Sequence, residues 1–192
     1  MSTDLYVYFP ELQADLLPRI TARLAEFGMD CTIEPDFRLE DETHNGFLPI
    51  KVKMLSVGPA AWRGKEYLTG FECVLSDFSY VDEIKKIQNP PKPNFVQKLL
   101  FKTSQPIARK FIADQDTDDI LKRCNKVFTI NYHHSGEMIS NAFAAVLAEL
   151  TSGLVYDPQD DEYLLPQSAL AEISALIEDP LSYSESELDQ AD

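Results

Sequence analysis

The sequence lacks the features that mark several large classes of protein. It contains no run of about 18 apolar residues, the length that a transmembrane helix needs. Its 7 glycines are scattered, whereas a phosphate-binding loop needs several close together. The motifs G-x-S-x-G, G-x-x-x-x-G-K-[ST], G-x-G-x-x-G and H-E-x-x-H are all absent. The sequence therefore predicts no membrane-spanning helix and disfavours nucleotide chemistry.

Cysteine is also scarce. The 3 cysteines, Cys31, Cys73 and Cys124, are odd in number and form no C-x-x-C motif, so neither a disulfide framework nor a zinc knuckle is expected. We expect buried free thiols. The first residues carry no basic segment before the short apolar stretch 5–9, which does not fit a secretory signal. A cytoplasmic protein is the expectation.

The length and composition of the chain are typical of a globular protein with a hydrophobic core. The chain has 192 residues, of which 44% are hydrophobic and 26% are charged. This balance is typical of a single folded domain that needs no disulfide or structural metal. We expect that domain to cover residues 1–181. Residues 182–192 are rich in Ser, Glu and Asp, and we expect them to form an acidic, disordered tail.

Periodicity predicts an α+β fold, in which a mainly antiparallel sheet packs against two principal helices, 11–27 and 136–151. The first helix has apolar residues at spacings of three and four, a blemish at Pro18, and Gly28 as its C-cap. The second is apolar nearly all round, which predicts a central core helix. Further helices are expected at 117–126 and 168–177. Strands are expected at 5–9, 31–34, 48–55, 68–78, 127–132 and 154–156.

The charge is uneven along the chain. Residues 1–83 carry 15 acidic and 7 basic side chains, residues 84–126 carry 4 and 10, and residues 127–192 carry 13 acidic and no basic ones. The formal net charge of −15 argues against nucleic acid and anionic membranes as partners. One interpretation is a solvated surface that promotes solubility. The other is a docking surface for a basic protein.

Two groups of residues suggest a metal site, and neither has the required spacing. His133 and His134 are neighbours in a predicted strand end, so they point to opposite faces. The run from Asp114 to Asp118 matches the first, third and fifth positions of an EF-hand loop, but the twelfth position is Asn125 rather than Glu. Helix capping accounts better for these aspartates. We expect no metal, no cofactor and no catalytic residues.

A second carboxylate cluster follows the strand at 154–156. It comprises Asp157, Asp160, Asp161 and Glu162. Paired acids after a strand could hold magnesium in a small hydrolase or transferase. However, the sequence has no second cluster, nucleophile or phosphate loop at a recognisable spacing. An Asp-Pro turn followed by exposed acids is the simpler interpretation.

Residues 141–159, NAFAAVLAELTSGLVYDPQ, resemble a helix-to-strand pattern, L-A-x-L-T-x-G-x-V-Y-D-P-Q, found in small cytoplasmic bacterial proteins. Several of these are similar to immunity proteins of contact-dependent or type VI secretion toxin systems. The resemblance implies binding without catalysis: an immunity protein sequesters its cognate toxin by occluding the active site. It transfers no catalytic residue to this chain.

These observations lead to one hypothesis and two alternatives. The hypothesis is a cytoplasmic immunity protein that neutralises a basic toxin. Its predicted contact residues are the acidic side chains of two loops: Glu34, Asp36, Glu40, Asp41 and Glu42, and Asp157, Asp160, Asp161 and Glu162. The alternatives are the magnesium-dependent enzyme above and a phage or secretion-system accessory protein that self-assembles.

Overall fold

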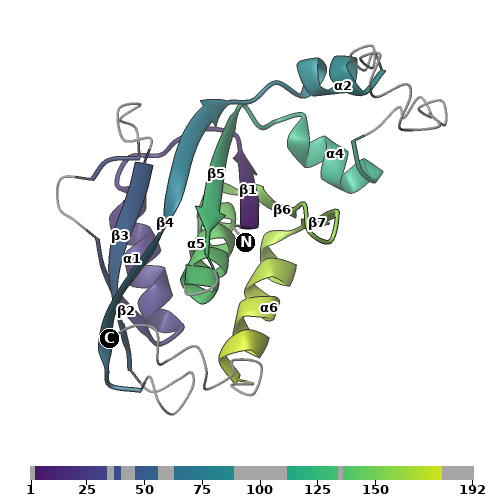
Figure 1. Cartoon of the computed structure of the whole chain (residues 1–192). Helices are drawn as coiled ribbons and strands as arrows, with labels where there is room; N and C mark the ends of the chain where they lie inside the picture. The colour runs from purple at the N-terminus through teal and green to yellow at the C-terminus, as the bar shows by residue number, and fades with distance from the viewer. Residues whose placement is uncertain are drawn as a thin grey trace, which may run out of the picture.

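The computed structural model describes residues 3–33, 37–39, 46–55, 63–88, 112–133 and 136–178. The described residues form both strands and helices (Figure 1). The strands are β1 (Thr3–Phe9), β2 (Met29–Ile33), β3 (Gly46–Met54), β4 (Glu66–Asp77), β5 (Lys126–Tyr132), β6 (Leu154–Asp157) and β7 (Glu162–Leu164). The helices are α1 (Leu16–Glu26), α2 (Tyr80–Gln88), α4 (Gln115–Leu121), α5 (Glu137–Thr151) and α6 (Pro166–Glu178).

The strands form one 7-stranded sheet in the order β2-β3-β4-β5-β1-β6-β7, and all pairs of neighbouring strands are antiparallel. The first strand of the chain is inserted between β5 and β6, where Val7 pairs with Phe128 on one side and with Val155 on the other. The predicted α+β class with a mainly antiparallel sheet is therefore confirmed.

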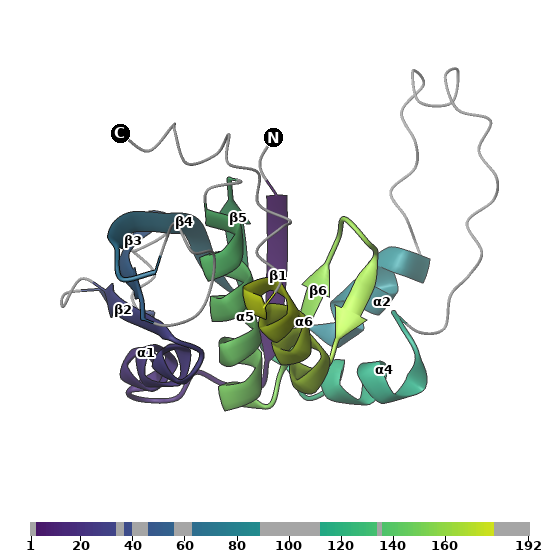
Figure 2. The ribbon, with the colours of Figure 1, turned by 90° about the horizontal axis from the view of Figure 1, so that it is seen from below.

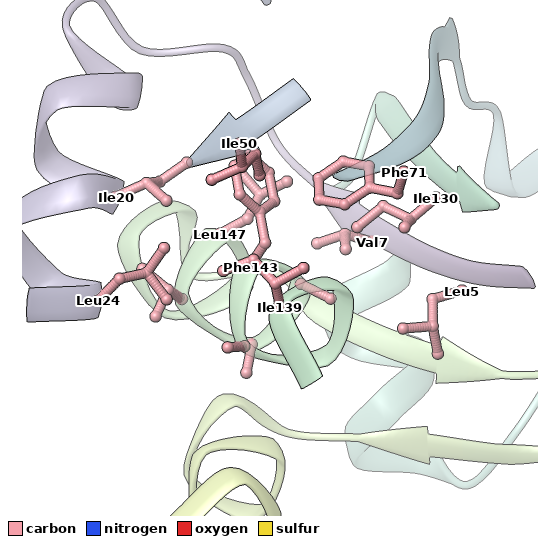
Figure 3. Close-up of a cluster of buried hydrophobic side chains, with 14 of the residues drawn as sticks. Leu5, Val7, Ile20, Leu24, Ile50, Phe71, Ile130, Ile139, Phe143 and Leu147 are labelled. Atoms are coloured by element: carbon pink, nitrogen blue, oxygen red, sulfur yellow. The ribbon is translucent and has the colours of Figure 1, made fainter. Parts of the chain in front are cut away.

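Alternation along the strands defines the core face of the sheet. In β1, Leu5, Val7 and Phe9 are buried, whereas the residues between them are half-buried. The β5 strand repeats this pattern. Figure 3 shows side chains of these strands meeting those of α1 and α5. Phe143 of α5 lies at the centre, with its ring 5.1 Å from that of Phe71 and 6.0 Å from that of Phe128.

The helix α5 is central, as its sequence predicts, and it packs against β1, α1 and α6 (Figure 2). Its burial is nearly complete from Met138 to Ala148. The helix predicted at 168–177 is also confirmed as α6, which packs on α5. Between α1 and α5, the Arg23 guanidinium donates to both carboxylate oxygens of Glu149 at 2.8 and 2.9 Å.

Helix α1 begins at Leu16, later than the predicted start at residue 11. Pro18 therefore lies in the first turn, where the backbone amides have no intrahelical partner and proline is tolerated. The predicted C-cap is confirmed, because Gly28 has a φ of 79° and donates its amide to the Ala25 carbonyl.

In the described part of the segment between β4 and β5, helices α2 and α4 lie apart from α1 and α5 (Figures 1 and 2). The Phe78 amide donates to the Asn125 carbonyl, and the Asn125 amide donates to the Phe9 carbonyl. These two hydrogen bonds join the beginning and the end of the segment to each other and to β1. Leu121, Cys124 and Leu154 are buried outside the main core cluster. Helix α4 was predicted in part, at 117–126, whereas α2 and β7 were not predicted.

Several other predictions can be compared with the described residues. All 3 cysteines are buried free thiols, as predicted. Asp114 is the N-cap of α4 and accepts from the amides of Asp116 and Thr117, which confirms the capping interpretation. Among the helices of the described residues, none is long and apolar enough to cross a membrane. The predicted tail at 182–192 lies outside the described residues.

Candidate partner-binding face

The sheet face opposite α1 and α5 carries a series of aromatic rings. Tyr6 and Tyr8 alternate with the core residues of β1 and therefore lie on this second face. Tyr156 of β6 lies directly opposite Tyr6, and Tyr163 of β7 pairs with Tyr156. Phe78, just after β4, completes the series. We call these five side chains the aromatic row.

Neighbouring rings of the row are in contact from end to end. The centroids of Tyr156 and Tyr163 are 4.4 Å apart in a stacked arrangement. Tyr6 lies 6.1 Å from Tyr156, and Tyr8 lies 6.4 Å from Tyr163. Tyr8 and Phe78 meet edge to face at 4.8 Å. Such a surface of large, rigid and amphipathic side chains is typical of the centre of a protein interface.

The tight turn between β6 and β7 places the second predicted acid cluster beside Tyr156 and Tyr163 of the aromatic row. Asp157, half-buried, accepts from the Gln159 amide at 2.7 Å. Asp161, in a left-handed conformation with a φ of 52°, accepts from the Tyr156 hydroxyl at 2.9 Å. Asp160 and Glu162 are exposed. We call Asp157, Asp160, Asp161 and Glu162 the hairpin acids.

The hairpin acids are not neutralised by a neighbouring cation. Within the part of the chain that the structure describes, none of them forms an ion pair with lysine or arginine. A fifth carboxylate, Glu172 of α6, lies close to them. Glu172 is largely exposed, but partial desolvation raises its pKa, and the charges of Glu162, Asp157 and Asp160 raise it further. The native fold therefore holds like charges together, an arrangement that a bound cationic surface would relieve.

A hollow of about 350 Å³ adjoins the aromatic row. Tyr6, Tyr8 and Phe78 line it. The other lining residues are three acidic ones, Asp77, Asp82 and Glu83, together with Ser79, Val127 and Thr129. Burial raises the pKa of Tyr8, and the charge of Glu83 raises it further, which places that carboxylate near the phenol.

The carboxylates that line the hollow already take part in interactions within the chain. Lys126 donates to Asp77 at 2.7 Å, and Lys85 donates to Asp82 at 3.0 Å. The carboxylates of both pairs are well exposed, at 88% and 60%. Exposed pairs of this kind contribute at most about 1 kcal/mol. A partner can therefore exchange its own cation for either lysine at little cost.

Of the two acidic loops of the prediction, the structure describes only the second. Glu34, Asp36, Glu40, Asp41 and Glu42 lie outside the described residues. His134 also lies outside the described residues, and those residues include no group of three His, Cys, Asp or Glu side chains that could hold an ion. Asp118, proposed as an EF-hand position, is fully buried and accepts from Tyr80 and from the amides of Ile112 and Ala113.

Sequence reasoning missed the aromatic row and the hollow. The alternation of Tyr6 and Tyr8 was a usable signal, because residues two apart in a strand share a face. The other three rings come from distant parts of the chain and join this face only through the strand order. Comparisons with protein-family models, with curated proteins and with solved structures found no match to this chain.

Proposed function

We propose that this protein is a cytoplasmic immunity protein that binds a basic toxin and covers its active site. The observation that carries the proposal is that the hairpin acids, beside the aromatic row, form no ion pair with any lysine or arginine among the described residues. Carboxylates speed and orient the encounter with a basic surface. Tyrosines supply contact area that becomes desolvated when the complex forms. Both parts of an interface are thus adjacent on one face.

The chemistry of the partner follows from this charge. A toxin that cuts or modifies nucleic acid must hold phosphates, so its active site is basic. An acidic inhibitor can occupy that site as a substitute for the nucleic acid backbone. The hairpin acids have the right charge for this role and lie on a rigid turn between two paired strands.

The first experiment is a capture from lysate of the source organism, with the tagged full chain as bait. Washes at about 0.05 M and then about 0.5 M NaCl separate partners held by charge alone from those also held by apolar contact. Mass spectrometry then identifies the retained proteins. We expect one basic protein at a near-equimolar amount, retained in part at high salt because the tyrosines also contribute.

Two matched variants locate the contact. The hairpin variant carries Asp160→Lys, Asp161→Lys and Glu162→Lys, and the control carries Glu11→Lys, Asp30→Lys and Glu66→Lys at exposed acids elsewhere. Both change the net charge equally. We expect the hairpin variant to bind the purified partner about tenfold or more weakly, with little change in the control. Equal weakening by both variants would mean that only the total charge matters, and unchanged affinity would remove the hairpin from the interface.

A further inference from the structure

The hollow at the Phe78 end of the aromatic row has a composition suited to one kind of ligand. Two tyrosine rings and one phenylalanine ring line it together with three carboxylates. An aromatic face attracts a cation through its quadrupole. A carboxylate accepts a charge-assisted hydrogen bond from the same cation. A neutral or anionic ligand would gain from neither feature.

We propose that this hollow binds the guanidinium group of an arginine side chain from the basic partner. The inference rests on the proposed function, because it names the group that the partner would insert. Arginine fits better than lysine: its planar guanidinium can stack on a ring and donate two parallel hydrogen bonds to one carboxylate. Interface anchors are enriched in arginine and fill pockets near the centre of the contact.

The positions of the lining residues agree with this assignment. Asp82 and Glu83 come from the first turn of α2, and Tyr6 and Tyr8 come from the sheet, so carboxylates and rings approach the hollow from different elements. The volume of about 350 Å³ lies near the lower end of the range of about 300–1,000 Å³ found for small-molecule sites.

The test uses the full chain and two short peptides, hexa-arginine and hexa-lysine, so that it does not depend on identifying the toxin. Titration followed by NMR of the aromatic side chains reports directly on Tyr6, Tyr8 and Phe78. We expect these resonances to shift and saturate with hexa-arginine, and hexa-lysine to bind about fivefold or more weakly. Shifts confined to other aromatic residues, or equal affinity for the two peptides, would overturn the assignment.

Variants then separate the rings from the charges. Phe78→Leu removes a π face and keeps an apolar side chain, and Glu83→Gln removes a charge and keeps the shape. Each is expected to weaken hexa-arginine binding about threefold to tenfold. The matched control is Glu72→Gln, an exposed acid of β4 that does not line the hollow. If Glu72→Gln weakens hexa-arginine binding to the same extent, the effect comes from the total charge of the protein, and the proposal is overturned.

The chain itself contains another source of cations. Residues 89–111 include Lys92, Lys98, Lys102, Arg109 and Lys110. A variant with glutamine at these five positions tests whether they compete for the hollow. Peptide binding gained only in this variant would assign the hollow to the chain's own basic residues and overturn the partner assignment.

The experiments can reject the arginine site and the proposed immunity function independently of each other. If the hairpin variant loses the toxin but the peptides do not map to the hollow, only the arginine site is wrong. If hexa-arginine binds the hollow but no basic partner is captured, the site exists and the immunity function is wrong.

Discussion

The Tyr80 hydroxyl of α2 donates a 2.5 Å hydrogen bond to the fully buried carboxylate of Asp118 in α4. The other oxygen of this carboxylate accepts from the amides of Ile112 and Ala113 at 3.1 and 3.0 Å. Asp118 therefore links α2, α4 and the chain that precedes α4. Since α2 supplies Asp82 and Glu83 to the hollow, this bond also supports the candidate binding surface.

Tyr80→Phe removes this donor and leaves one carboxylate oxygen without a partner in the interior. We expect the free energy of unfolding to fall by about 1–3 kcal/mol, measured by urea unfolding. Tyr156→Phe is the matched control, because it removes a hydroxyl bonded to Asp161 at the exposed turn, and its cost should stay below about 1 kcal/mol. If both variants lower the free energy of unfolding equally, the burial of Asp118 does not determine the cost of losing the hydrogen bond.

Stability should decrease at alkaline pH. Burial raises the pKa of Cys73 and of Cys124 from 9.0 to about 11, and chiefly burial raises that of Tyr80 and of Tyr132 from 10.0 to about 12. The unfolded chain therefore loses these protons first and binds fewer of them than the folded chain. The stabilisation is present below about pH 9 and is lost progressively up to about pH 12.

Urea unfolding at several values between about pH 8 and about pH 11 measures this loss. Cys124→Ala supplies the control, since removal of one buried thiol should flatten the decrease above about pH 9. A free energy of unfolding that stays constant over this range would contradict the burial of these groups.

Gly153, just after α5, lies against the backbone of β1. A Cβ atom at this position would meet the Tyr8 carbonyl oxygen at 2.1 Å, so β1 and β6 would have to separate. We expect Gly153→Ala to cost about 3 kcal/mol or more. At Gly46 nothing lies within 4 Å of the same added atom, and Gly46→Ala should change stability by less than about 0.5 kcal/mol. Similar thermal midpoints for the two variants would contradict this packing.

The repulsion between Glu172 and the hairpin acids predicts a small effect on stability. Glu172→Gln removes one of the mutually repelling charges. Because this side chain is exposed and therefore screened, we expect a gain of about 0.5 kcal/mol or less at neutral pH, smaller still at high salt. Thermal unfolding with Glu11→Gln as the control measures it. A loss of stability would mean that Glu172 has a favourable contact that outweighs the repulsion.

Much of the fold follows from local patterns in the sequence. The apolar residues of α5 leave so narrow a polar face that only a central position suits it, and the alternation of Ile50, Val52 and Met54 with two lysines marks β3 as a strand with one exposed face. These elements were predicted because their periodicity extends over many residues. The position of Pro18 fits the same rules once the helix begins at Leu16.

What the sequence did not reveal depends on short elements and distant pairings. β7 contains only Glu162, Tyr163 and Leu164, too few residues to show a period. The aromatic row requires β1 to lie between β5 and β6, an order that no local pattern specifies. The hairpin acids were identified from composition, whereas their position beside Tyr156 and Tyr163 was visible only in the folded chain.

The most direct test of the proposed function is a growth assay with the captured basic protein. That protein is expressed in cells alone, with the wild-type chain, with the hairpin variant, or with the control variant that carries lysine at Glu11, Asp30 and Glu66. We predict that the captured protein alone stops growth and that the wild type and the control restore it, whereas the hairpin variant does not. Full rescue by a folded hairpin variant, or normal growth with the captured protein alone, would contradict the account.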